Sequence, residues 1–185
     1  MAVLSLETRG PLEVERSTLS PLLLDKVREQ VERTQHLLGL VPRDKRSWRP
    51  DCPGPLLTLG DLLGHILECL AGFCAALYQA NPERLAHFLD LKALPVNHSC
   101  DVEEARGRIG SYLRHVEEAF DVLSDEHLSR VVPTLFVPEG EALFTILLGN
   151  LEHLINHKYQ LFVYLKMLGV PVATPDLYRL RGQAG

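Results

Sequence analysis

Apolar residues recur at helical spacing along four long stretches of the chain. On an α-helix, positions three and four residues apart share a face, so this recurrence predicts one buried side per helix. The pattern predicts helices at 21–39, 59–79, 102–123 and 139–169, with Glu141 as a second candidate start for the last. No alternation of strand and helix patterns is present. Four long amphipathic helices in a single domain predict an all-α four-helix bundle.

Capping residues mark where three of these helices begin. Ser20 precedes Pro21, which predicts an N-cap followed by the first helical residue, where the missing N–H of proline costs nothing. Thr58 is followed three residues later by Asp61, a pattern close to the capping box that predicts the start of the second helix. Ser99 or Asp101 is expected to cap the third helix.

The connections predict little additional regular structure. Short extra helical turns are expected at 82–88 and 124–129, and an extended segment or a short strand at 131–138. The loop at 41–57 is rich in proline, and its Trp48 is expected to pack over a helix end. Pro171 and Pro175 exclude continuation of the last helix, so the chain beyond Gly169 is expected to be irregular.

The totals fit one globular domain. The 185 residues suffice for a single full core, which predicts a domain at 20–178 between a lead-in at 1–19 and a tail at 179–185. A net charge of −5 argues against nucleic acid as a partner. The first residues lack the basic and apolar regions of a secretory signal, and polar residues interrupt the last helix at 152–158, so no membrane span is expected. Four cysteines without metal-binding spacing fit reduced thiols, and we expect a cytoplasmic protein.

Histidines supply the candidate chemistry. His153 and His157 lie four residues apart in the last helix, so they share a face, and His65 lies in the apolar second helix. Bundle cores build metal sites from facing helices, so these three residues are a candidate divalent-metal site. The remaining histidines are expected at the surface: His36, His87, His98, His115 and His127.

The residues alone leave other interpretations open. Each histidine could be a buried imidazole bonded within the core, and the bundle could bind a small ligand or a partner protein without catalysis. A di-iron bundle needs Glu-x-x-His pairs, and none of the eight histidines has a glutamate three residues earlier. Three protein ligands would leave a position for water or substrate, which is typical of a catalytic metal.

The motifs in three stretches of this sequence, at 58–68, 151–169 and 169–178, resemble those of the DinB-like or YfiT-like family of metal-dependent enzymes. TLGDLLGHILE, at 58–68, resembles the family's second-helix segment with its single ligand histidine. LEHLINHKYQLFVYLKMLG, at 151–169, resembles the helix with H-x-x-x-H, then Q-L, then a Y-L-x-x-L-G ending. GVPVATPDLY, at 169–178, resembles the loop that follows, and a looser likeness extends from Ser20 to Tyr178.

The resemblance implies a four-helix bundle, often a homodimer, with one divalent metal on His65, His153 and His157. Zinc or nickel is the expected metal, with iron and manganese as other candidates. The resemblance also implies a small-molecule substrate and either a thiol-dependent transferase, which would use a low-molecular-weight thiol such as bacillithiol or mycothiol, or a hydrolase. Many relatives have a further histidine and an R-G pair where this chain has Asn156, Lys158 and Tyr159, which affects substrate choice.

Helical spacing nominates neighbours of these histidines. Glu68 and Asn150 are candidates to accept the second N–H of a ligand and so fix its tautomer, with an ordinary surface or interhelical polar group as the alternative for each. Cys69 is a candidate nucleophile or fourth ligand, with a small core residue as the alternative. The same spacing places other residues beside the site: Asp61, Gly72, Gln160, Leu161 and Tyr164.

Overall fold

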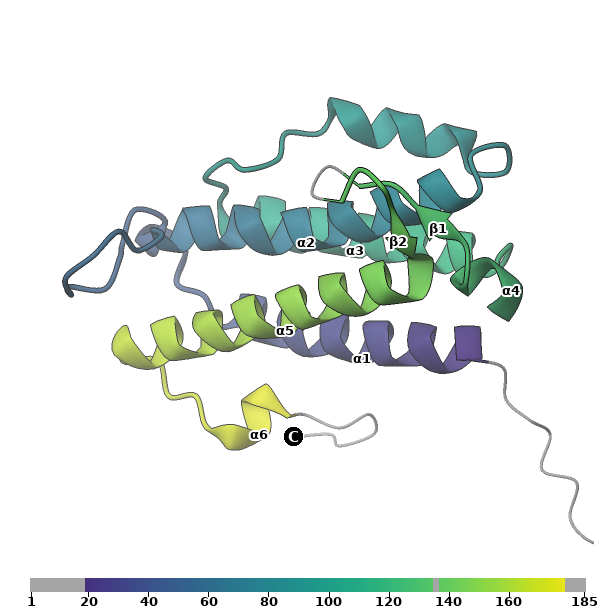
Figure 1. Ribbon diagram of the computed structural model, residues 1–185. Coiled ribbons are helices and arrows are strands. Elements are labelled where there is room, and N and C mark those ends of the chain that lie inside the picture. The colour runs from purple at the N-terminus through teal and green to yellow at the C-terminus, as the bar shows by residue number, and fades with distance from the viewer. Residues whose placement is uncertain (1–18, 135–136, 179–185) are drawn as a thin grey trace, which may run out of the picture.

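A computed structural model describes residues 19–134 and 137–178, and four long helices dominate it (Figure 1). They are α1 (Leu19–Gly39), α2 (Leu59–Ala80), α3 (Val102–Phe120) and α5 (Leu143–Met167). The all-α bundle predicted from the hydrophobic pattern is therefore confirmed. Residues 1–18 of the predicted lead-in and the predicted tail at 179–185 lie outside the described residues.

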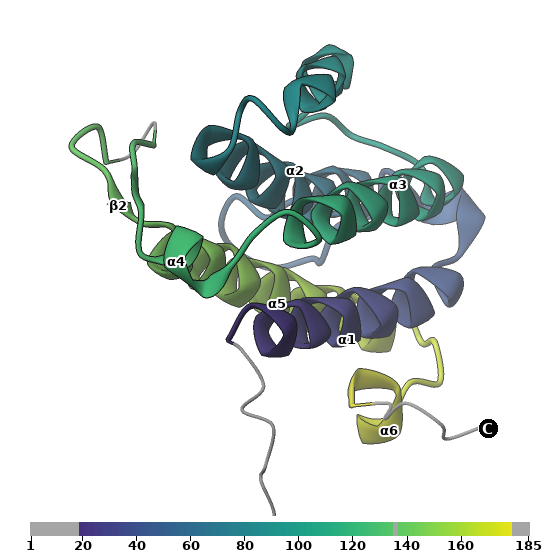
Figure 2. The ribbon, with the colours of Figure 1, turned by 90° about the vertical axis from the view of Figure 1, so that its right-hand side faces the viewer.

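The four helices form two layers, α1 with α5 and α2 with α3 (Figure 2). Going around the bundle, α1 packs on α3, α3 on α2, α2 on α5 and α5 on α1. α1 and α5 run in one direction, and α2 and α3 run in the opposite direction (Figure 1). Because α2 and α3 are parallel, the chain between them must return along the outside of α2. A 3₁₀ helix, η2 (Ala86–Ala93), lies on this return path.

α2 is the core helix of the bundle, and its start is fixed as predicted. The Thr58 hydroxyl accepts a hydrogen bond from the Asp61 N–H at 3.1 Å, and the Asp61 carboxylate accepts one from the Thr58 N–H at 3.2 Å. Leu59–Ala80 is long and apolar enough to cross a membrane, but 67% of its most apolar window is buried inside the protein. This burial fits the core helix of a soluble bundle.

The predicted N-cap of α1 is wrong. Ser20 lies inside the helix and is buried. The Asp125 carboxylate, from the short helix α4 (Asp125–Leu128), accepts the backbone N–H groups of Leu19 and Ser20 at 2.8 Å each. A side chain distant in sequence thus caps α1, which local pattern cannot reveal. α4 itself is the extra turn expected at 124–129.

The last long helix begins later than predicted because a small sheet precedes it. Strand β1 (Val131–Val132) pairs antiparallel with β2 (Glu141–Ala142), so Glu141 belongs to a strand and α5 starts at Leu143. Gly140 has φ +86°, a conformation that glycine adopts without strain, and it turns the chain into β2. The short strand expected within 131–138 forms at Val131–Val132, while Pro138 lies in a turn and residues 135–136 lie outside the described residues.

Two other connections differ from the sequence prediction in their helical structure. The turn expected at 82–88 is displaced to η2, in which Phe88 is the buried residue. The chain after Gly169 is not irregular throughout, because a short helix, α6 (Thr174–Leu177), forms there. Pro175 occupies its first turn, and the Asp176 carboxylate accepts the Ala173 N–H at 2.8 Å.

Candidate metal centre

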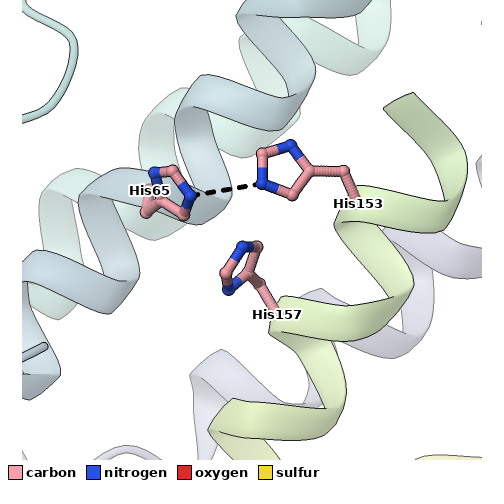
Figure 3. Close-up of side chains that lie close together, drawn as sticks. All are labelled: His65, His153 and His157. Carbon is pink, nitrogen blue, oxygen red and sulfur yellow. Dashed lines mark hydrogen bonds between the residues drawn. The ribbon is translucent and has the colours of Figure 1, made fainter. Parts of the chain in front are cut away.

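α2 and α5 pack against each other and bring the three predicted histidines together. His65 lies in the second turn of α2, and His153 and His157 lie near the middle of α5. Their rings turn toward a common space (Figure 3). One nitrogen from each ring can be chosen so that all three lie within 4.8 Å of one another. The triad is half-buried, so these three residues could hold a metal ion that solvent can still reach.

Glu68 fixes the orientation of the His65 ring. The Glu68 carboxylate lies 2.7 Å from His65 Nδ1, one helical turn away on the same face of α2. A carboxylate accepts the Nδ1 proton of a neutral imidazole, which leaves the Nε2 lone pair free to bind a metal. Glu68 therefore has the role that helical spacing nominated for it.

A chain of hydrogen bonds orients His157 in the same way. His157 Nδ1 donates to the Gln160 side-chain oxygen at 3.0 Å, and the Gln160 amide donates to the Tyr164 hydroxyl at 3.2 Å. The Tyr164 hydroxyl donates to the Leu57 carbonyl oxygen at 3.0 Å, in the loop before α2. Every bond in this chain points the same way, so the Nε2 lone pair of His157 is also left free. The Trp48 ring packs edge-on against Tyr164, as expected for a residue at a helix end.

His153 lacks such a partner in the described part of the chain. Its Nε2 lies 3.2 Å from Nε2 of His65, a contact drawn as a dashed line in Figure 3. One of these two nitrogens must carry a proton when they bond directly. Since His65 keeps its proton on Nδ1 for Glu68, that proton belongs to His153 Nε2. A metal bound between the rings would replace this proton, and His153 would shift its proton to Nδ1.

The histidines of α5 are held in the neutral form that metal binding requires. Burial lowers the pKa of His153, and the neighbouring His65 lowers it further. Burial also lowers the pKa of His157, although its bond to Gln160 opposes that shift. A neutral imidazole has a lone pair for a metal, so these directions favour metal binding near neutral pH.

Cys69 is a core residue, not a ligand or a nucleophile. Its side chain is buried, and its Sγ donates to the backbone carbonyl of His65 at 3.3 Å. Burial raises the pKa of the Cys69 thiol to about 12, so it stays protonated at neutral pH. The alternative interpretation of this residue is the one the structure supports.

Other nominated neighbours have structural roles. The Asn150 side chain packs against Gly72 of α2, where a Cβ would leave it too little space, and it bonds to no ligand histidine in the described residues. Asn150 is therefore not a hydrogen-bond acceptor for a ligand here, and the alternative of an interhelical polar group is the one that its close approach to Gly72 supports. Asp61 caps the start of α2, and Leu161 is a buried core residue.

Lys158, at a position where many relatives differ, is also buried. Its ammonium group donates a hydrogen bond to the side-chain oxygen of Gln30 in α1 at 2.7 Å.

The histidines expected at the surface are less exposed than predicted. Only His87 among them is exposed, with its ring 3.1 Å from the Glu118 carboxylate, and the other four are half-buried and also have partners within the fold. The partners are the Asp176 carboxylate for His36, the Glu104 carboxylate for His98, the Ser111 carbonyl for His115 and the Ser124 side chain and N–H for His127. None of them belongs to a metal-binding group in the described residues.

The fold and the site together define a four-helix bundle with three histidines that could hold one metal ion. The sequence matches no family model and no curated protein. Its structure is similar to the crystal structure of a DinB-like protein, YjoA, from Bacillus subtilis, with a TM-score of 0.61. The two share 19% sequence identity, and the match covers 82% of this chain and 96% of that chain. The chain therefore has the DinB-like fold that its motifs predicted.

The donors present fit a divalent metal. Imidazole suits zinc, nickel and iron, and two of the three rings are already bonded through the nitrogen that would face away from the metal.

Sequence reasoning did not find Asn97, whose side chain bonds to Glu68 at 2.8 Å. Asn97 lies in the loop between η2 and α3, where no periodic pattern relates it to α2.

Proposed function

We propose that this protein is a metal-dependent enzyme in which His65, His153 and His157 hold one divalent metal ion. The observation that carries this proposal is the convergence of three ring nitrogens from two facing helices. We propose zinc or nickel as the metal, because imidazole ligands suit both. Iron and manganese are the other candidates, because geometry and supply also decide which metal a histidine site contains in a cell.

The number and exposure of the donors favour catalysis over a structural metal. Structural zinc sites are closed by four protein ligands, whereas catalytic sites have three and leave one position open. Here three histidines form the cluster, and Cys69 is directed elsewhere. The His65 side chain keeps 29% of its surface exposed, so a small molecule can approach the donors.

A divalent metal in such a site supplies a Lewis acid that lowers the pKa of a water molecule or a thiol. The protein's own part is to hold the donors still: Glu68 and Gln160 keep the Nδ1 protons of His65 and His157. We propose a thiol-dependent transfer or a hydrolysis of a small-molecule substrate. In the transfer, the thiol sulfur bonds to an electrophilic carbon, the leaving group departs with its electron pair, and the thiol proton passes to solvent.

Activity assays of metal-free and metal-reloaded protein test this proposal. One assay supplies glutathione, bacillithiol or mycothiol with an aryl halide, and the other supplies an aryl ester without a thiol. We expect turnover that needs zinc or nickel in one of these assays and is lost in His153→Ala. Equal turnover by that variant would place the activity elsewhere, and absence of turnover in both assays would favour a bundle that binds a ligand without catalysis.

A further inference from the structure

The loop that leads into α3 lies directly on α2 beside His65. The Cys100 N–H donates to the Gly60 carbonyl of α2 at 3.1 Å. One turn later, a Cβ at Gly64 would overlap the backbone carbonyl of His98. Two glycines on one face of α2 thus let the loop backbone touch the helix backbone. This contact fixes the position of Asn97, the residue before His98.

Asn97 has an unusual backbone conformation at this point. Its φ is +53°, and among the described residues it is the only one other than glycine with a positive φ. Asparagine is among the few residues that adopt this left-handed conformation readily. Such outliers persist where the surrounding structure holds them, and they are common at functional sites. Here the conformation accompanies a side-chain amide bonded to Glu68 of α2.

The bond links the loop to the candidate ligand His65. The Asn97 amide donates to one oxygen of Glu68 at 2.8 Å, and the other oxygen of Glu68 lies 2.7 Å from His65 Nδ1. The Glu68 side chain is half-buried, with 31% of its surface exposed, so packing leaves it more rotamer freedom than a core residue has. A glutamate in that setting loses side-chain entropy when it is fixed. The hydrogen bond from the Asn97 amide restricts the Glu68 side chain to the rotamer that faces His65.

We propose that Asn97 is a positioning residue of the metal centre, acting through Glu68 on His65. The proposal rests on the proposed function, since it assigns the loop to the same three-histidine site. Partners beyond the ligands typically change metal affinity by about 10- to 100-fold when removed. Asn97 is one bond further out than Glu68, so its removal is expected to weaken binding by roughly 10-fold, at the lower end of that range.

The substitution Asn97→Gly tests the role of the side-chain amide apart from that of the backbone conformation. Glycine adopts φ +53° without strain, so the loop is expected to keep its path while the amide is lost. We expect zinc affinity, measured by competition with a chromophoric chelator, to fall roughly 10-fold while the urea midpoint does not decrease. Unchanged affinity would overturn the proposal, as would a loss of affinity that merely follows a loss of stability.

A double-mutant cycle with Glu68→Ala tests whether Asn97 acts through Glu68. In the Glu68→Ala background, Asn97→Gly is expected to leave zinc affinity unchanged, because the link to His65 is already broken. Full additivity of the two effects would overturn the proposed route.

Nitrogen NMR of the metal-free protein provides a readout that does not require metal binding. Wild type is expected to show His65 mainly with its proton on Nδ1, and Asn97→Gly to show a mixture of both tautomers. An unchanged tautomer ratio would overturn the proposal. The tautomer ratio could differ between wild type and Asn97→Gly as expected while wild type binds no zinc. In that case the proposed enzyme function would fail, and the positioning of His65 by Asn97 would still hold.

Discussion

His65→Ala, His153→Ala and His157→Ala should each bind zinc or nickel more than about 100-fold more weakly than wild type, since loss of an outer partner alone costs about 10- to 100-fold. Each substitution removes one of three donors from a cluster whose nitrogens lie within 4.8 Å of one another. Competition with a chromophoric chelator measures these affinities. Far-UV circular dichroism should show an unchanged helix content, because all three side chains are half-buried and not part of the core.

His115→Ala is the matched control for these variants. His115 is also a half-buried helical histidine, and its ring bonds to the Ser111 carbonyl at 2.8 Å within α3. Its affinity for zinc should equal that of wild type. A similar loss of affinity in this variant and in the three others would mean that metal binds nonspecifically to histidines. Retention of affinity in any one of the three would remove that residue from the site.

The second large effect is expected at Gly64, where the loop backbone crosses α2. Alanine at this position would place its Cβ on the His98 carbonyl, which belongs to the backbone and cannot turn aside. Overpacking of this kind costs about 1–3 kcal/mol, and a Cβ that overlaps a backbone oxygen favours the upper part of that range, which exceeds the roughly 1 kcal/mol that alanine gains over glycine within a helix. We expect Gly64→Ala to lower the free energy of unfolding, measured by urea denaturation. Displacement of the loop should also weaken zinc binding, because the loop carries Asn97.

Gly107 provides the control for this prediction. It is an exposed glycine inside α3, and a Cβ there would meet nothing within 4 Å. Gly107→Ala should therefore raise the free energy of unfolding by about 0.5–1 kcal/mol, the helix-propensity difference alone. If both variants were stabilised equally, the close contact between Gly64 and the loop would be wrong.

The sequence predicted the long helices because their burial follows a 3.6-residue period. It failed where a residue depends on a distant partner. The cap of α1 comes from Asp125, which lies 105 residues beyond Ser20 in the chain. The start of α5 depends on the pairing of Val131 with Ala142, so a helical pattern read forward from Glu141 could not detect it.

The residues of the candidate site also include some that local spacing predicted and one that depends on a distant contact. His153 and His157 follow from their spacing within one helix, and Glu68 follows from its place one turn after His65. Asn97 does not follow from any spacing, because it reaches Glu68 only through the crossing of a loop over Gly64. His65 was joined to the pair on α5 because bundle cores build metal sites from facing helices, the resemblance implied the same three ligands, and the structure brings the three together.

Several expectations from the sequence remain predictions. The homodimer, the small-molecule substrate and the thiol are proposals that follow from the resemblance. The burial of α2 agrees with a soluble protein, and a cytoplasmic location is still a prediction.

Metal content of the untagged protein is the most direct test of the three-histidine site. Wild type and His65→Ala are purified, incubated with zinc or nickel, freed of unbound metal and analysed by elemental mass spectrometry. The three-histidine site predicts about one metal ion per wild-type chain and little in the variant. Absence of metal from both proteins would contradict the account, and the three histidines would then be structural residues of the bundle.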